Sequence, residues 1–186
     1  MNWKGTVREY RHWLKVEKGL SENTSESYLH DLQRYQAYME EQGIRNPLKV
    51  STNDIRDFIQ WLSKEALLNE NSLARNISSL RSFHKFLFQE DYTEKDPTEL
   101  LDVPKLTRKL PVYLTVEEID RIYAEIDHST AHGVRNRAML ELLYSSGLRV
   151  SELVNLERSM LYMDEGFVRV FGKGGRKGWC PWGNRR

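Results

Sequence analysis

The sequence predicts a mainly α-helical protein, with an N-terminal four-helix bundle, a linker and an incomplete α+β part that carries a small β-hairpin or sheet. Three observations predict this class. The first hundred residues repeat apolar side chains with a helical period, three prolines interrupt the pattern in segment 97–111, and residues 167–171 alternate with a period of two. The length of 186 residues suits one or two compact domains.

The first two helices are predicted by apolar side chains that recur at three- and four-residue steps. Their inward positions are Val7, Tyr10, Trp13 and Leu14 in the first helix, and Tyr28, Leu32, Tyr35 and Met39 in the second. Gly19 and Gly43 are placed to end these helices, because glycine readily adopts the left-handed conformation of a helix C-terminus.

The third and fourth helices begin at polar residues that can cap a helix. Ser51 or Thr52 caps the third, with Asp54 in its first turn, and Asn71 or Ser72 opens the fourth. The inward positions are Ile55, Phe58, Ile59 and Leu62 in the third helix, and Leu73, Ile77, Leu80, His84 and Leu87 in the fourth. We expect His84 to be a core residue. Four helices with short connections predict a bundle.

The segment after the bundle is rich in proline and basic residues, and we place the domain boundary there. The predicted parts are a helical domain 1–97, a linker 98–114 and a second part 115–186. In the second part Thr115 and Glu118 form a capping box. A helix over 134–146 follows, with Ala138, Leu142 and Leu143 inward and Gly147 at its end. Then come a short helix SELVNL and a strand over 167–171.

Composition excludes several classes of protein. Lys plus Arg is 28 and Asp plus Glu is 27, so the net charge is +1 and any nucleic-acid surface must come from local clusters of cations. The single cysteine, Cys180, excludes an internal disulfide or a multi-cysteine zinc site. No apolar run is long enough for a membrane span and the N-terminus has no signal core. We expect a cytoplasmic protein with no metal, no cofactor, no membrane partner and no small-molecule substrate.

The fourth predicted helix has a polar face that combines cations with hydroxyls. Its members are Arg75, Ser78, Arg81, Ser82 and Lys85. Cations attract a phosphate backbone and hydroxyls fix its register, so this face is a candidate DNA-binding surface. An ordinary solvated helix face would show the same pattern. The linker adds three further candidate cations, Lys105, Arg108 and Lys109.

Two glycine-containing segments of the second part are candidates for phosphate chemistry. Arg149 follows Gly147, and Glu152 lies three residues later, so the arginine is either a fixed donor for a phosphate or half of a structural ion pair. Lys173 lies at the tip of a Gly-Lys-Gly-Gly turn, which could enter a groove or be a plain surface turn. The spacing is not that of a P-loop. Arg176 and Lys177 continue a tail without acidic residues.

Taken in order, four segments of the chain resemble the tyrosine recombinase family (phage-type integrases), and particularly its Xer-type bacterial members. These are LARNISSLRSFHKFLF, DPTELLDVPKLTRKLPVYLTVEEID, RNRAMLELLYSSGLRVSELVNL and FVRVFGKGGRK. The resemblance runs from about Val7 to Lys177. It implies an N-terminal SAM-like core-binding domain and a C-terminal catalytic domain, with double-stranded DNA and other recombinase protomers as partners.

The resemblance also implies a reaction. In the family a tyrosine attacks a phosphodiester and forms a 3′-phosphotyrosyl link with a free 5′-hydroxyl, and a second hydroxyl reverses the step without ATP or metal. Arg149 matches the first catalytic arginine, which stabilises the transition state. Lys173 matches the hairpin lysine that protonates the departing 5′-oxygen, and Glu152 matches the acid that supports the arginine.

The chain departs from the family after Lys173. The family's second arginine box and nucleophilic tyrosine do not follow, and all nine tyrosines lie at or before Tyr162. We therefore expect a C-terminally truncated protein without the nucleophilic tyrosine. Segment 178–186 begins with Gly-Trp-Cys-Pro-Trp-Gly at 178–183, where the family has a pattern like R-x-V-P-L-G. A one-base shift in codons for Met-Val-Pro-Leu-Gly yields Trp-Cys-Pro-Trp-Gly, which suggests a frameshift.

Three roles stay open at this point. The chain is a DNA-binding recombinase relative that is inactive alone, a non-catalytic regulator that competes or heterodimerises with an intact recombinase (or an inert remnant), or a helical protein-interaction module without a DNA role.

Overall fold

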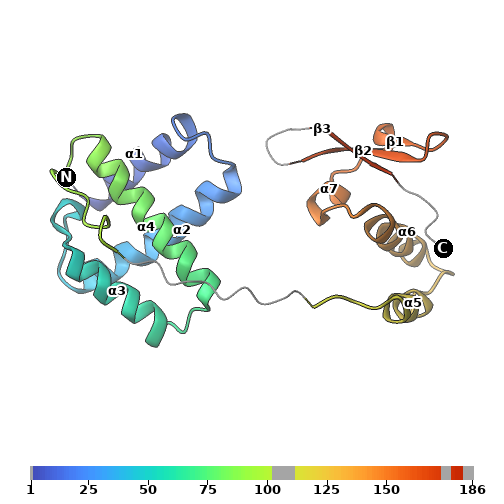
Figure 1. The fold of residues 1–186 in the computed structure, drawn as a ribbon, viewed down its shortest axis with the longest axis horizontal. Helices are drawn as coiled ribbons and strands as arrows, with labels where there is room; N and C mark the ends of the chain where they lie inside the picture. Colours follow the sequence, from blue (N-terminus) through green and yellow to red (C-terminus); the bar gives the residue numbers. More distant parts are fainter. Residues whose placement is uncertain (1, 102–111, 173–176, 182–186) are drawn as a thin grey trace. The chain divides into compact units, whose positions relative to one another are not determined.

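The computed structural model describes residues 2–101, 112–172 and 177–181 (Figure 1). The chain separates into two compact units, Met1–Lys109 and Leu110–Arg186. The first unit is helical, and the second combines helices with a small antiparallel sheet. The predicted fold class, mainly α with a small sheet in the second part, is confirmed.

Four α-helices and one 3-10 turn form the first unit. They are α1 (Trp3–Val16), α2 (Glu22–Glu41), η1 (Pro47–Lys49), α3 (Thr52–Lys64) and α4 (Glu70–Gln89). Ser51 caps α3, and Asp54 accepts a hydrogen bond from the Ser51 backbone N–H, which completes a capping box. The predicted start of α4 was two residues late. Asn69 caps this helix, since its Oδ1 accepts from Ser72 N at 2.9 Å.

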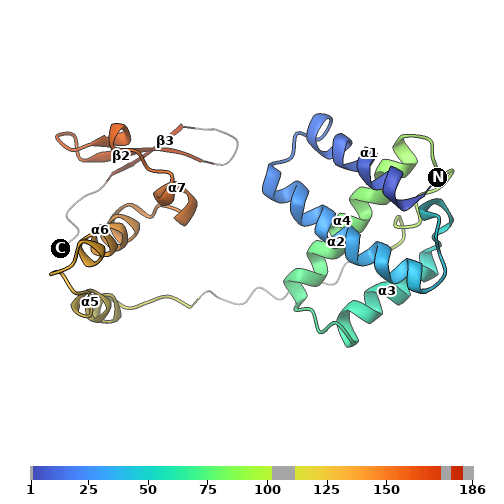
Figure 2. The same ribbon diagram turned by 180° about the vertical axis from the view of Figure 1, so that it is seen from behind.

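The core of the first unit is aromatic and lies between α4 and the other three helices (Figures 1 and 2). The ring centroid of Trp3 lies 5.6 Å from that of Tyr35 and 6.0 Å from that of Phe83. Most of the predicted inward positions are buried. Four of them are only half-buried at the edge of the core: Val7, Tyr28, Ile59 and Leu73.

The residues that follow α4 pack back on the first unit. The Pro97 carbonyl accepts a hydrogen bond from Thr52 Oγ1 at 2.9 Å, and Arg81 donates to the Leu101 carbonyl. Leu101 is 5% exposed and belongs to the core. Residues 98–101, the first four of the predicted linker 98–114, therefore belong to the helical unit. Leu101 packs in its core, and the Leu101 carbonyl is bound by Arg81.

The second unit carries three α-helices and three short strands in its described part. The elements are α5 (Val116–Ala124), α6 (Ala131–Ser146), α7 (Val150–Val154), η2 (Arg158–Met160), β1 (Leu161–Tyr162), β2 (Phe167–Phe171) and β3 (Lys177–Pro181). The strands form an antiparallel sheet in the order β1-β2-β3. The capping box of Thr115 and Glu118 and the strand 167–171 are present as predicted.

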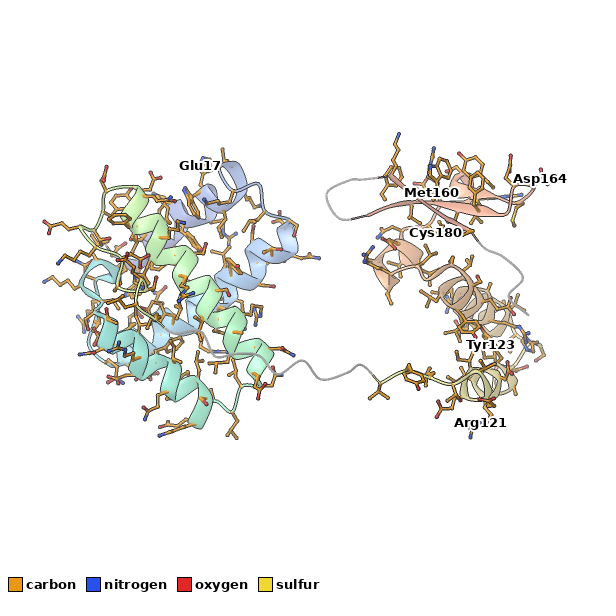
Figure 3. The ribbon with its side chains drawn as sticks, viewed as in Figure 1. Glu17, Arg121, Tyr123, Met160, Asp164 and Cys180 are labelled. Atoms are coloured by element: carbon orange, nitrogen blue, oxygen red, sulfur yellow. The ribbon has the colours of Figure 1, made fainter. Side chains whose placement is uncertain are left out.

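One face of the sheet covers the small core of the second unit. Val168 and Val170 alternate inward from β2 and pack with Leu148 and Leu153. Cys180 reaches the same cluster from β3, on the face of the sheet that is turned toward the helices (Figure 3). The described part of segment 178–186, which the sequence marked as unlike the family, thus supplies an inward side chain to this sheet.

The prediction for α6 is partly wrong. Leu142 and Leu143 are half-buried against the small core, but Ala138 is exposed. Only Gly133 is fully buried on this helix. The helix therefore packs one edge, with Met139, Leu142 and Leu143, against the small core, while Val134 and Tyr144 are exposed.

Candidate nucleic-acid interface and phosphate-binding arginine

The polar face of α4 lies opposite the side that enters the core. Ser78 and Lys85 are exposed, and Arg75, Arg81 and Ser82 are half-buried. Arg75, Ser78, Ser82 and Lys85 follow one another at three- and four-residue steps, so they form one stripe along the helix. We call these four residues the α4 stripe.

Arg75 is held by two groups of α2. Its Nη1 lies 2.8 Å from Asp31 Oδ2 and donates to the Ser27 carbonyl at 3.3 Å. The Asp31 side chain is completely buried, whereas 40% of the Arg75 side chain is exposed. The guanidinium is thus anchored from below while part of it faces solvent.

Sequence analysis missed Asp31. Burial raises the pKa of its carboxyl, and the positive charge of Arg75 opposes that rise. The signal was available, because Asp31 lies three residues after Tyr28 and four before Tyr35, on the apolar stripe of α2. A lone acid at such a position predicts a buried charge that needs a partner.

The other residues of the polar face differ in their contacts. Arg81 donates to the Leu101 carbonyl and so also stabilises the end of the helical unit. Ser78 Oγ donates to the Ala74 carbonyl within its own helix at 2.9 Å. Lys85 makes no ion pair with any residue in the described ranges. Lys85 is therefore the cation of this face that makes neither an ion pair nor a side-chain hydrogen bond with another described residue.

His84 is a core histidine, as predicted. Its Nε2 lies 3.0 Å from the hydroxyl of Tyr35 and both side chains are buried. Burial lowers the pKa of His84 to about 4, so the ring is neutral at pH 7. Its role is to satisfy the tyrosine hydroxyl inside the bundle.

The turn between α6 and α7 presents Arg149. Gly147 ends α6 with φ of 64°, a left-handed conformation that suits glycine, and Leu148 is buried as an anchor. Arg149 is the N-cap residue of α7, and 73% of its side chain is exposed. The backbone therefore turns sharply and projects the guanidinium into solvent.

Glu152 holds Arg149 at two points. Its Oε2 accepts from the Arg149 backbone N–H at 2.8 Å, and its Oε1 accepts from Arg149 Nη1 at 2.8 Å. Only 8% of the Glu152 side chain is exposed. These hydrogen bonds lower the pKa of Glu152 and keep its carboxyl ionised, and the bond from the Arg149 backbone N–H has the larger effect. Arg149 is thus half of an ion pair and can still be a phosphate donor. The ion pair fixes the exposed guanidinium and leaves its other N–H groups available.

Several predicted site residues lie outside the described residues: Lys105, Arg108, Lys109, Lys173 and Arg176. Lys177 is described and is exposed at the start of β3, where it pairs with Phe171 across the sheet. The catalytic role of Lys173 thus stays a prediction.

Two absences concern residues 2–101, 112–172 and 177–181 only. No cluster of three or more histidine, cysteine or acidic side chains that could hold a metal ion occurs among those residues. In the same ranges, no helix combines the length and the apolar character needed to cross a bilayer.

Sequence comparisons match both units. A family profile described as "Phage integrase, N-terminal SAM-like domain" matches residues 7–91, and a "Phage integrase family" profile matches residues 112–185. The tyrosine recombinase XerD of Chlorobaculum tepidum is 45% identical over 184 residues, and the match covers 97% of this chain and 60% of the relative. XerD of Oceanobacillus iheyensis is 44% identical over 179 residues, with 96% and 60% covered. The chain thus spans about three fifths of the length of these relatives.

Solved structures with the same fold are integrases. A lambda integrase dimer bound to a COC′ core site aligns with a TM-score of 0.76 at 19% identity, covering 97% of this chain and 62% of that one. The Tn1549 transposon integrase in complex with circular intermediate DNA aligns with a TM-score of 0.67 at 18% identity, covering 96% and 61%. These likenesses support the fold alone. The two consecutive profile matches and the XerD relatives lead to one conclusion: the chain belongs to the tyrosine recombinase (phage integrase) family.

Proposed function

We propose that this chain binds duplex DNA through the polar face of α4, and that Arg149 is the phosphate-binding arginine of a site-specific recombinase. The observation that carries the proposal is the Arg149–Glu152 pair, in which a nearly buried carboxylate fixes an exposed guanidinium. A fixed fork of N–H donors suits the negative charge that develops on a phosphate during transfer. The lambda and Tn1549 integrases of similar fold were solved in complex with DNA, which supports DNA as the partner.

The proposed chemistry is strand exchange through a covalent intermediate, for DNA integration and recombination. A tyrosine oxygen attacks the phosphorus, the bond from phosphorus to the 5′-oxygen breaks, and a 3′-phosphotyrosyl link forms. Arg149 binds the non-bridging oxygens, and Lys173 gives the departing 5′-oxygen its proton. A hydroxyl of another strand then reverses these steps and releases the tyrosine.

We propose that the 186 residues alone do not perform this cleavage, because all nine tyrosines lie at or before Tyr162, whereas the nucleophile of the family follows the hairpin lysine. Tyr10 and Tyr35 are fully buried in the helical core. Tyr162 packs against Phe167 and Trp179 on the sheet. We expect no denaturant-stable adduct between this chain and a nicked duplex trapping substrate. An adduct in that assay would show that one of these tyrosines is reactive.

DNA binding is tested by a mobility-shift titration of the chain against a mixed-sequence duplex at several salt concentrations. Affinity should fall steeply with salt, because cations that bind phosphates release counterions. Lys85→Gln should weaken binding and lower the salt slope by about 1. Lys49→Gln is the matched control, since Lys49 is an exposed lysine of η1 outside the α4 face. Equal effects of the two substitutions would remove the α4 face from the proposal. Binding that is absent or independent of salt would favour a protein-interaction module.

The role of Arg149 is tested in a chimera that continues this chain with the C-terminal part of the C. tepidum XerD. Arg149→Ala should lower strand cleavage by about 10²- to 10³-fold while DNA affinity changes little, because the arginine acts mainly in the transition state. Arg158→Ala is the control, since Arg158 is an exposed arginine of the same unit. Equal losses of cleavage and affinity in Arg149→Ala would make Arg149 a binding residue only.

A second candidate function is regulation of an intact recombinase by competition or by heterodimer formation. The observation that favours it is the large, self-contained core of the DNA-binding helical unit. Adding this chain to an intact XerD relative and scoring recombination separates the two cases. Inhibition that excess DNA relieves supports competition for sites, inhibition that excess DNA leaves unchanged supports a heterodimer, and no inhibition contradicts regulation.

A further inference from the structure

The strongest feature outside the proposed catalytic site is the contact between Asp31 and Arg75. It joins a completely buried carboxylate of α2 to a cation whose side chain is 40% exposed on α4. The one other ion pair among the described residues of this unit joins Lys15 to Glu22, whose side chain is exposed. The Asp31–Arg75 pair is thus built differently from a surface salt bridge.

Burying Asp31 has an energetic cost that packing alone does not explain. A buried carboxylate loses its hydration, and an apolar side chain of similar size often stabilises such a site as well or better. Within the described residues, neither carboxylate oxygen of Asp31 makes a hydrogen bond of good geometry, and Asn76 Oδ1 also makes none. The contact of Oδ2 with Arg75 Nη1 at 2.8 Å is therefore an ion pair without an aligned hydrogen bond. The pair therefore contributes little net stability to the fold. Its main effect is on the position of the Arg75 guanidinium.

The contact determines where the guanidinium lies. Nη1 is occupied by Asp31 at 2.8 Å and by the Ser27 carbonyl at 3.3 Å, both on α2. The other N–H groups of Arg75 have no partner among the described residues and belong to the exposed part of the side chain. A long arginine side chain that is fixed in this way has already lost rotamer freedom before a ligand arrives.

We propose that Asp31 is a positioning residue, which holds the Arg75 guanidinium on the α4 stripe so that its free N–H groups bind a backbone phosphate of duplex DNA. This inference rests on the proposed DNA binding of the α4 face. Ser78, Ser82 and Lys85 continue the same stripe, so the phosphate bound by Arg75 is one of several contacts along a strand.

The sign of one substitution separates positioning from general electrostatics. Removing any negative charge from the protein should strengthen DNA binding slightly, because repulsion of the phosphates falls. Positioning predicts the opposite for Asp31→Asn, because Arg75 loses its strong anchor. Glu26→Gln is the matched control, since Glu26 is an exposed acid of the same helix and makes no ion pair with a described residue.

The experiment measures the Kd for a mixed-sequence duplex with the full 186-residue chain, at constant salt and pH 7. Asp31→Asn should weaken binding about three- to tenfold, and Asp31→Ala more, because asparagine keeps an acceptor for Arg75. Glu26→Gln should leave the Kd unchanged or lower it. Circular dichroism and thermal unfolding verify that each variant is folded. If Asp31→Ala does not fold, the isosteric Asp31→Asn and the Arg75 variants still decide the result.

A double-mutant cycle tests whether Asp31 acts through Arg75. In the Arg75→Gln background, Asp31→Asn should have no further effect on the Kd. A merely structural role of Asp31 would weaken binding to the same degree in both backgrounds, and that result would overturn the inference. So would unchanged or tighter binding by Asp31→Asn with wild-type Arg75. If the wild-type chain itself shows no salt-dependent binding, the proposed function fails, and that outcome is distinct from the other two.

Discussion

The two units of the chain bury their apolar side chains to very different degrees. Among the described residues, the core cluster of the helical unit contains seventeen buried hydrophobic side chains, whereas that of the second unit contains four. Exposed large hydrophobic side chains show the reverse distribution, with four in the first unit and twelve in the second. The twelve are Val112, Tyr113, Leu114, Val116, Ile122, Val134, Tyr144, Val150, Val154, Met163, Phe171 and Trp179.

The difference follows from how the helices meet. In the first unit α4 offers apolar side chains to α1, α2 and α3, and each of those helices has a matching face. In the second unit α5 has no buried residue and α6 buries only Gly133. A helix contributes stability mainly through the face it buries. The first unit therefore has the means to fold alone, whereas the helices of the second unit leave much of their apolar surface exposed in the described residues.

The comparison is tested most severely by separating the units. We expect residues 1–101 to unfold cooperatively in urea, with a clear pre-transition baseline. Residues 112–186 should show a broad, non-cooperative change and bind the dye ANS, because exposed apolar surface binds it. Circular dichroism and ANS fluorescence measure both. Cooperative unfolding of 112–186 without dye binding would contradict the comparison.

The same substitution in each unit gives the next largest effect. Leu62→Ala removes a fully buried side chain from the helical core and should lower the free energy of unfolding by about 3 kcal/mol. Leu153→Ala acts in the cluster of four, where neighbours can collapse, and should cost about 1 kcal/mol. Hydrogen exchange of amides in α3 and in β2 reports the two units separately. Equal losses in the two units would show that the second core is better packed than its burial indicates.

The sequence predicted the first unit more fully than the second, for physical reasons. A helix with a complete partner, such as α3, shows its buried face as Ile55, Phe58 and Leu62 at regular steps. Strand β2 was also predictable, because Val168 and Val170 alternate over a real core. Ala138 was misplaced because α6 has little to pack against, so its periodicity does not report burial.

The candidate site was predictable as residue types but not as contacts. Arg149 and Glu152 were found because a three-residue spacing on a helix start brings them together. Asp31 was missed because its partner, Arg75, lies on another helix. Leu101 was missed for the same reason, since its packing depends on a contact with Arg81. The periodicity of a sequence predicts which face of a helix is buried. It does not predict which residue of another helix a single polar side chain contacts.

A pH titration should distinguish the units through His84. Burial holds its pKa at about 4 in the folded state, below the ordinary value of 6.5. The unfolded chain therefore binds a proton that the folded chain does not, and stability falls as pH decreases from 6.5 to 4, by about 3 kcal/mol in total. Urea unfolding of residues 1–101 at several pH values measures this loss.

The control for that titration is His84→Gln, which should remove the dependence between pH 6.5 and 4. Asp31 contributes with the opposite sign, because its raised pKa makes the folded state bind the extra proton at low pH. The difference between wild type and His84→Gln cancels the Asp31 contribution. No histidine is buried among the described residues of the second unit, so His84 has no counterpart there. An unchanged pH profile in His84→Gln would refute the assignment.

The smallest effect is expected from removing the N-cap side chain of a capping box, which is present in both units, at the start of α3 and of α5. Ser51→Ala removes the cap of α3, a helix packed into the large core, and should lower the free energy of unfolding of the first unit by about 1 kcal/mol. Thr115→Ala removes the equivalent cap of α5, which buries no residue, so the helix frays locally and global stability changes little. Hydrogen exchange at the first turn of each helix measures both effects. If Thr115→Ala destabilised the β2 amides as much as Ser51→Ala destabilises those of α4, α5 would be coupled to the core of its unit, and the contrast between a self-sufficient and a dependent unit would not hold.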